Sequence, residues 1–154
     1  MLLFRFICGI LMAWAINVAL ARPEAAALMK EAPEFGVMAS IAGAFVGFAN
    51  LAVRQGWGLI VAVANGIWSG VLTIFISIFL YLIAVPVLTS WRIIDHFNDF
   101  MRIVSQALEP LLLLVIDTQL LVVVLAACAV VGVVTEVVHW ALVHLMRRKL
   151  REED

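Results

Sequence analysis

The sequence predicts an all-α integral membrane protein with four transmembrane helices and an amphipathic helix on the outer face, between helices three and four. Hydrophobic residues make up 66% of the 154 residues and charged residues 14%, against about 45–50% and about 25% in soluble domains. The mean hydropathy is +1.14. Such a chain is too apolar for disorder and has too little polar surface to coat a soluble globule. The charged residues also separate apolar runs long enough for a bilayer, which needs about 20 residues per helix.

The predicted spans lie near 4–21, 36–53, 57–86 and 111–146. The last two apolar runs are longer than one crossing and too short for two crossings with a turn. Each is therefore interpreted as a single tilted or projecting helix. Pro86 is expected to end or kink the third helix, because proline removes a backbone donor and clashes with the preceding turn. Pro110 is expected to open the fourth helix, since proline is well tolerated in a first turn.

The basic cluster after the fourth span sets the predicted orientation. Residues 147–151 read Arg-Arg-Lys-Leu-Arg, and cytoplasmic segments carry an excess of Lys and Arg. An even number of spans places both termini on one side. We therefore expect both termini in the cytoplasm, with 147–154 as a basic tail. An alternative stays open for the N-terminus, because Ala19-Leu20-Ala21 also resembles the cleavage site of a signal peptide.

The segments between the spans predict three connections. Within the outer loop, residues 25–31 could form a short helical turn. The link 54–56 is tight, so helices two and three should form an antiparallel hairpin. In segment 91–109, apolar residues recur at helical spacing on one face and polar residues recur on the opposite face. This is the pattern of an amphipathic helix. Its apolar face could lie in the outer membrane interface or cover the ends of helices three and four.

Small and weakly polar residues recur every four positions within two spans. Such residues let membrane helices approach closely. The predicted helix-packing positions are Gly43, Gly47, Gly66 and Gly70. The third span also carries a polar stripe that should face inward, because hydrocarbon cannot satisfy its hydrogen bonds: Asn65, Ser69, Thr73, Ser77 and Tyr81. The stripe is interpreted either as a packing seam or as a polar conduit.

Glu136 is the charged residue that most needs an explanation. It lies eleven residues before Arg147, about 16 Å along a helix. If Arg147 marks the cytoplasmic interface, Glu136 is near mid-bilayer, where a charge costs at least about 2.5–3.5 kcal/mol. His139 follows on the same face. Asn65, Ser69 and Asn17 are the expected neighbours across the bundle.

The candidate intramembrane polar centre therefore comprises Glu136, His139, Asn65 and Ser69. A structural hydrogen bond, a proton relay or a metal site could explain the Glu136–His139 pair. A metal needs more ligands than Glu-x-x-His supplies, so no metal or other cofactor is expected. Asp117 is expected near the outer end of the fourth helix. No catalytic constellation is present, so the chain is not expected to be an enzyme. Its net charge of −1 argues against nucleic-acid binding.

The beginning of the third span resembles a known family. The stretch from Gly56-Trp57-Gly58 to Ala62-Val63-Ala64-Asn65-Gly66 is similar to the "A-x-x-N-G" opening of a helix in the TrgA family. The order of spans and connections is similar too. The resemblance implies a small bacterial inner-membrane protein associated with tellurite resistance. It implies no catalytic residues, and only Asn65 is carried over as a shared motif position.

Two other functions stay open beside the one that the resemblance implies. A short chain with exposed apolar faces and an outer amphipathic helix could be a non-catalytic accessory or assembly subunit of a larger membrane complex. The polar centre and the polar stripe could instead serve an oligomeric proton-linked transporter or channel. The expected partners are accordingly the lipid bilayer and either a larger membrane complex or further copies of the chain.

Overall fold

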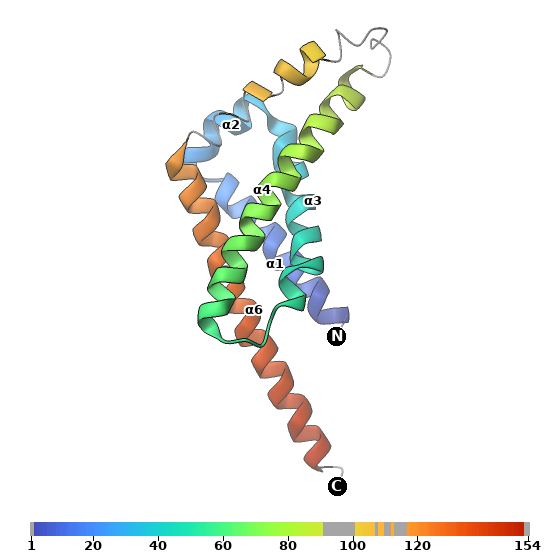
Figure 1. Cartoon of the computed structure of the whole chain (residues 1–154), viewed down its shortest axis with the longest axis vertical. Coiled ribbons are helices and arrows are strands. Elements are labelled where there is room, and N and C mark those ends of the chain that lie inside the picture. The colour runs from blue at the N-terminus through green and yellow to red at the C-terminus, as the bar shows by residue number, and fades with distance from the viewer. Residues whose placement is uncertain (1, 91–100, 107, 110–111, 113–116, 153–154) are drawn as a thin grey trace.

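The computed structural model describes residues 2–90, 101–106, 108–109, 112 and 117–152. This part of the chain is all-helical, as the sequence predicts. The long helices are α1 (Leu2–Leu20), α3 (Pro33–Ala49), α4 (Leu59–Ser90) and α6 (Thr118–Glu152). With η2 continuing α3, all four are long and apolar enough to cross a membrane. The integral membrane class with four spans is thereby confirmed (Figure 1).

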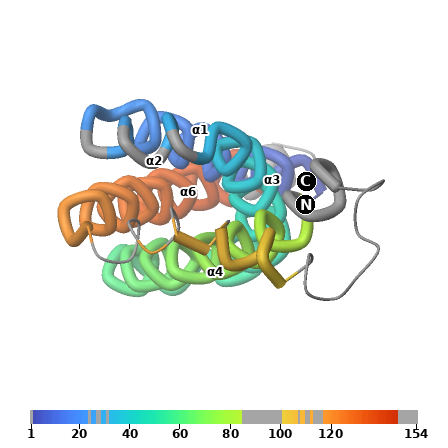
Figure 2. The backbone as a smooth tube through the Cα atoms, turned by 90° about the horizontal axis from the view of Figure 1, so that it is seen from above, coloured from blue at the N-terminus to red at the C-terminus, as the bar shows by residue number. Residues whose placement is uncertain are grey.

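The four long helices form a bundle in which each packs against two neighbours. Helix α1 packs against α3 and α6, and α4 packs against the same two helices (Figure 2). At one end of the bundle, η1 (Pro23–Ala25) and α2 (Ala26–Glu31) connect α1 to α3. At the other end, η2 (Leu51–Val53) and residues 54–58, which we call the α3–α4 link, connect α3 to α4. Both the helical turn and the hairpin predicted from the sequence are present.

Two helix boundaries differ from the prediction. Helix α4 does not end at Pro86 but continues to Ser90, because a proline inside a helix removes only one backbone hydrogen bond and the turns around it can continue. Helix α6 begins at Thr118 rather than near 111. Asp117 Oδ1 accepts the backbone N–H groups of Gln119 (3.0 Å) and Leu120 (3.2 Å), which makes Asp117 the N-cap of α6.

Helices α4 and α6 extend beyond the bundle at opposite ends (Figure 1). The last turns of α4 pass the level of α2, and the last turns of α6 pass the α3–α4 link. The predicted basic tail therefore continues α6, which is helical as far as Glu152. Both chain ends lie on the α3–α4 link side of the bundle.

The predicted amphipathic helix falls partly outside the described residues. Residues 101–106 and 108–109 are helical, whereas residues 91–100 and 107 are not among those described. Its place at an outer membrane interface stays a prediction.

Glycines bring the helices of two pairs into backbone contact. In the α1–α3 pair, a Cβ atom on Gly47 would lie 2.5 Å from the carbonyl oxygen of Cys8. In the α4–α6 pair, a Cβ on Gly66 would lie 2.5 Å from the carbonyl oxygen of Cys128, and one on Gly132 would lie 2.3 Å from that of Ala62. Such separations leave no room for any side chain, so these glycines set the distance between the helices.

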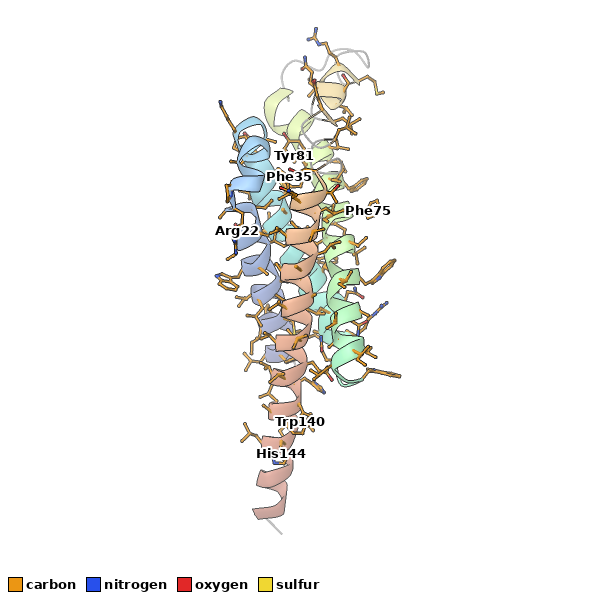
Figure 3. All side chains as sticks on the ribbon, turned by 90° about the vertical axis from the view of Figure 1, so that its left-hand side faces the viewer. Arg22, Phe35, Phe75, Tyr81, Trp140 and His144 are labelled. Carbon is orange, nitrogen blue, oxygen red and sulfur yellow. The ribbon has the colours of Figure 1, made fainter. Side chains whose placement is uncertain are left out.

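The other two predicted packing glycines also lie at these contacts. A Cβ on Gly43 would lie 3.3 Å from Cγ1 of Ile16, and one on Gly70 would lie 2.9 Å from Cβ of Cys128. Gly132, which is not among the predicted packing positions, makes the closest of these approaches. At the α2 end of the bundle, the Phe35 ring meets the Tyr81 ring edge-on at 5.8 Å between centroids (Figure 3).

Candidate functional site

The Glu136 carboxylate on α6 binds the backbone at the beginning of α4. Oε2 accepts the N–H of Gly56 at 2.7 Å and Oε1 accepts the N–H of Gly58 at 3.0 Å. We call Glu136 with Gly56 and Gly58 the Glu136 site. Gly58 immediately precedes α4, and its carbonyl accepts the N–H of Ala62. The carboxylate thus lies at a helix N-terminus, where unpaired N–H groups and the helix dipole favour negative charge.

The conformation of the α3–α4 link explains why glycine occupies both binding positions. Gly56 and Gly58 have φ values of +99° and +100°, in a region that side-chain-bearing residues rarely adopt. The two turns direct both N–H groups towards Glu136 and leave Trp57 between them, 78% exposed. Glycine at positions 56 and 58 is therefore needed for the shape of the link.

A second pair of side chains fastens the same link to α6. Gln55 Nε2 donates to Thr135 Oγ1 at 3.0 Å and to the carbonyl oxygen of Leu51 at 3.2 Å. Thr135 in turn donates within α6, to the carbonyl oxygens of Val131 and Gly132. Gln55 and Thr135 are both buried. Neighbouring residues of α6, Thr135 and Glu136, thus bind neighbouring residues of the link.

His139 packs beside the link without a hydrogen bond to Glu136 among the described residues. Its Nε2 atom would be 3.4 Å from a Cβ on Gly56. Its ring lies 5.4 Å from the Phe4 ring, at 59°. Within the part of the chain described, no three His, Cys, Asp or Glu side chains could hold a metal ion together. The geometry therefore places His139 as a packing residue between the link and α1.

The expected neighbours of Glu136 bind other groups, which corrects the sequence analysis. Asn65 Nδ2 donates to the carbonyl oxygen of Arg54 at 3.0 Å. Ser69 Oγ accepts from Asn50 Nδ2 at 3.3 Å, and Asn17 Nδ2 donates to Ser40 Oγ at 2.7 Å.

The depth assigned to Glu136 is the reason for this difference. The prediction takes Arg147 as the membrane interface, but α6 continues beyond the bundle. Glu136 therefore lies level with the α3–α4 link, at the end of the bundle, and not among the middle turns of α4. Three of the four candidate centre residues contact the link: Glu136, His139 and, through the carbonyl of Arg54, Asn65. Ser69 instead accepts a hydrogen bond from Asn50, the residue that follows α3.

The polar stripe of α4 faces inward from Ser69 to Tyr81, and the hydroxyl groups of Thr73 and Ser77 donate to their own helix. Ser69, Thr73 and Ser77 are at most 1% exposed. Thr73 Oγ1 donates to the carbonyl oxygen of Ser69 at 2.8 Å, and Ser77 Oγ donates to that of Thr73 at 2.6 Å. A cavity of about 20 Å³ adjoins Thr73 and Ser77, and its other lining residues are apolar. That volume suits about one water molecule, so the geometry favours a packing seam over a conduit.

The fold and the site define a class of protein. The described part of the chain is all-helical, with four helices long and apolar enough to cross a membrane, and a buried carboxylate of the last of these helices holds the link that precedes the third. No family model matches the chain, and no curated protein or solved structure matches it.

Proposed function

We propose that this chain is a non-catalytic accessory or assembly subunit of a larger membrane complex. The observation that carries the proposal is the part of α6 beyond Glu136, residues 137–152, which we call the α6 extension. It leaves the bundle as a continuous helix (Figure 1). Its apolar side chains are exposed, Trp140 at 74%, Leu145 at 60% and Met146 at 54%.

The α6 extension is well suited to carry a partner because its base is fixed. Glu136 and Thr135 hold α6 to the link immediately before the extension begins. Trp140 lies one turn further on, stacked against His144 with 6.1 Å between ring centroids (Figure 3). These side chains belong to the apolar stretch Thr118–Met146, which is long enough to cross a membrane, so their exposed apolar surface is available to a helix of a partner within the bilayer. A partner of the complex would cover that surface.

The transport alternative receives less support from the same contacts. Both Glu136 oxygens accept backbone hydrogen bonds, and Thr73 and Ser77 donate to their own helix. A proton relay needs groups that can exchange partners along a wet path. A hydrogen-bonding role in holding the link therefore explains Glu136 with fewer assumptions than proton transfer does.

The proposed location is the bacterial inner membrane, with both termini in the cytoplasm. Both chain ends lie on the side of the α3–α4 link (Figure 1). Arg5, Arg54 and the basic cluster after residue 146 belong to that side. An excess of Lys and Arg at one end of a bundle supports a cytoplasmic position for that end.

A second candidate function is support of tellurite resistance, implied by the resemblance to the TrgA family. The residues that carry the resemblance all pack at the beginning of α4. Ala62 is 2% exposed beneath Gly132, Asn65 holds the carbonyl of Arg54, and Gly66 contacts Cys128. A deletion strain should become more sensitive to tellurite, and unchanged growth on tellurite would remove this candidate.

Copurification in mild detergent tests the accessory role. The tagged wild-type chain should elute with a membrane protein in fixed stoichiometry. Trp140→Ser should lose that protein, because it removes the largest exposed side chain of the α6 extension. Trp14→Ser is the matched control: Trp14 is 64% exposed on α1 and lies outside the extension. Equal retention of the partner by both variants, or a wild-type chain that elutes alone, would contradict the proposal.

A further inference from the structure

An apolar groove lies between α1 and α3 on the outward side of their glycine contact. It is open and has a volume of about 300 Å³. The floor of the groove is the place where Gly9 of α1 contacts the backbone of α3. A Cβ on Gly9 would lie 2.8 Å from the carbonyl oxygen of Ala44. Larger side chains stand on both sides of this floor, and the full lining is Phe6, Gly9, Ile10, Ala44, Phe45 and Phe48.

One end of the groove carries an exposed arginine. The Arg5 guanidinium lies over the Phe48 ring, 6.0 Å from its centroid. Phe48 also packs against Phe6, with 5.2 Å between ring centroids. The aromatic pair thus places a cation beside the groove, close to the first residue of α1, at the end of a span where lipid head groups lie.

The positive charge near this end is not neutralised within the described residues. Among the described residues, neither Arg5 nor Arg54, which follows η2, forms an ion pair, and η2 itself packs against α1. The acidic residue of α6 at this end, Glu136, uses both oxygens on Gly56 and Gly58. The groove therefore combines an apolar lining that suits an acyl chain with a positive charge at the level of the lipid head groups.

We propose that this groove binds one anionic phospholipid, with its acyl chain against Phe6, Ile10 and Phe45 and its phosphate beside Arg5. Charge complementarity selects the lipid: basic sites between membrane helices attract anionic head groups. A zwitterionic lipid places its own cation near Arg5 and gains less. The inference is independent of the accessory role, because it concerns the groove between α1 and α3 and no part of the α6 extension.

Native mass spectrometry of the full chain in mild detergent tests the proposal, with phosphatidylglycerol and phosphatidylcholine of identical acyl chains as probes. The wild-type chain should retain one phosphatidylglycerol and prefer it to phosphatidylcholine. Arg5→Gln should weaken phosphatidylglycerol binding about fivefold, since one basic residue near an anionic head group contributes about 1 kcal/mol. Arg5→Lys should restore most of the binding. Arg22→Gln, the same change at the far end of α1, should have no effect.

A second pair of variants tests the groove itself. Phe45→Ser should weaken the binding of both lipids, because it removes one wall, whereas Phe75→Ser should leave both unchanged. Phe45 and Phe75 are similarly exposed, at 62% and 67%, and Phe75 lies on α4 away from the groove (Figure 3).

Several results would overturn the proposal. Equal binding of the two lipids would remove the role of charge, and so would equal effects of Arg5→Gln and Arg22→Gln. Displacement of phosphatidylglycerol by inorganic phosphate would show a free-anion site without an acyl chain. A change of oligomeric state in Phe45→Ser, with lipid retention unchanged, would show that a second copy of the chain occupies the groove.

Discussion

The α1–α3 and α4–α6 pairs both pack through glycines but differ in the polar contacts that accompany this packing. Both use glycines to bring backbones into contact, at Gly47 in the first pair and at Gly132 in the second. The first pair adds one side-chain hydrogen bond, from Asn17 to Ser40. The second adds the Glu136 site at one end, where a carboxylate reaches the backbone before α4.

This difference shows what glycine contacts do and do not determine. They fix how closely two helices approach, which both pairs share. Glycine contacts do not fix the position of the connecting segment that precedes a helix. In the α4–α6 pair that connection contains two residues with positive φ, and an acceptor on the facing helix stabilises the turn. Both pairs should therefore respond alike to loss of a glycine, and only α4–α6 should respond to loss of a buried acid.

The largest effect should come from filling the α4–α6 contact. Gly132→Ala places a Cβ 2.3 Å from the Ala62 carbonyl oxygen, so the helices must separate. We expect the free energy of unfolding to fall by about 3 kcal/mol, the upper part of the range for overpacking. Titration with a denaturing detergent in mixed micelles, followed by circular dichroism, measures it. Gly47→Ala should have a similar effect on α1–α3.

Gly36→Ala is the matched control for both substitutions. Its Cβ would meet only the Met29 Sδ atom, at 3.4 Å, which is ordinary contact with a flexible side chain. We expect a change below about 0.5 kcal/mol. A loss as large as that of Gly132→Ala would show that any residue larger than glycine is harmful in these helices, and the contacts described would not be the cause.

The next largest effect should come from Glu136→Gln. An amide has one acceptor oxygen where the carboxylate has two, so one of the N–H groups of Gly56 and Gly58 loses its partner and the helix N-terminus loses a charge. We expect a loss of about 2 kcal/mol in the same titration. Glu109→Gln, at an exposed position, should be neutral. Equal stabilities of the two variants would contradict the role given to the Glu136 site.

A smaller effect should follow from Asn17→Ala. The substitution removes the hydrogen bond to Ser40 at the edge of the α1–α3 pair, where Asn17 is exposed. Interhelical hydrogen bonds in membranes contribute about 0.6 kcal/mol on average, and a loss of that size is expected in the same assay. A loss comparable to that of Glu136→Gln would show that the two pairs depend equally on polar contacts.

The smallest effect should come from Thr73→Val on the polar stripe. Thr73 donates to its own helix, and its backbone carbonyl still accepts from Ser77 after the change. The shapes of the two side chains are similar and the lost hydrogen bond lies within one helix, so stability should change by less than the value of about 0.6 kcal/mol for an average interhelical hydrogen bond. Loss of function without loss of stability in this variant would favour the conduit interpretation of the stripe.

The apolar spans and the inward stripe could be predicted because hydrocarbon imposes them. A bilayer requires long apolar helices and leaves Ser69 and Thr73 no lipid-facing option. The start of α6 was missed although a signal was present, since Asp117-Thr118-Gln119 is a typical capping sequence. Gly132 was missed too, and its small-residue spacing from Cys128 could have indicated it.

The partners of Glu136 could not be predicted from periodicity. The prediction needed the depth of Glu136, and depth depends on how far α6 extends beyond its neighbours, which is a property of the packed bundle. The Gly56-Trp57-Gly58 sequence was the available signal, because two glycines around one residue often mark positive φ and accessible N–H groups. No sequence signal indicated that the Glu136 carboxylate would accept hydrogen bonds from these N–H groups.

Amide hydrogen exchange at Gly56 and Gly58 tests the central claim most directly, namely that the Glu136 carboxylate holds the α3–α4 link to α6. In the wild-type chain both amides should be protected, although both residues are exposed. In Glu136→Ala both should exchange many times faster, while amides in the middle of α3 keep their protection. Unchanged exchange at Gly56 and Gly58 in Glu136→Ala would contradict the account.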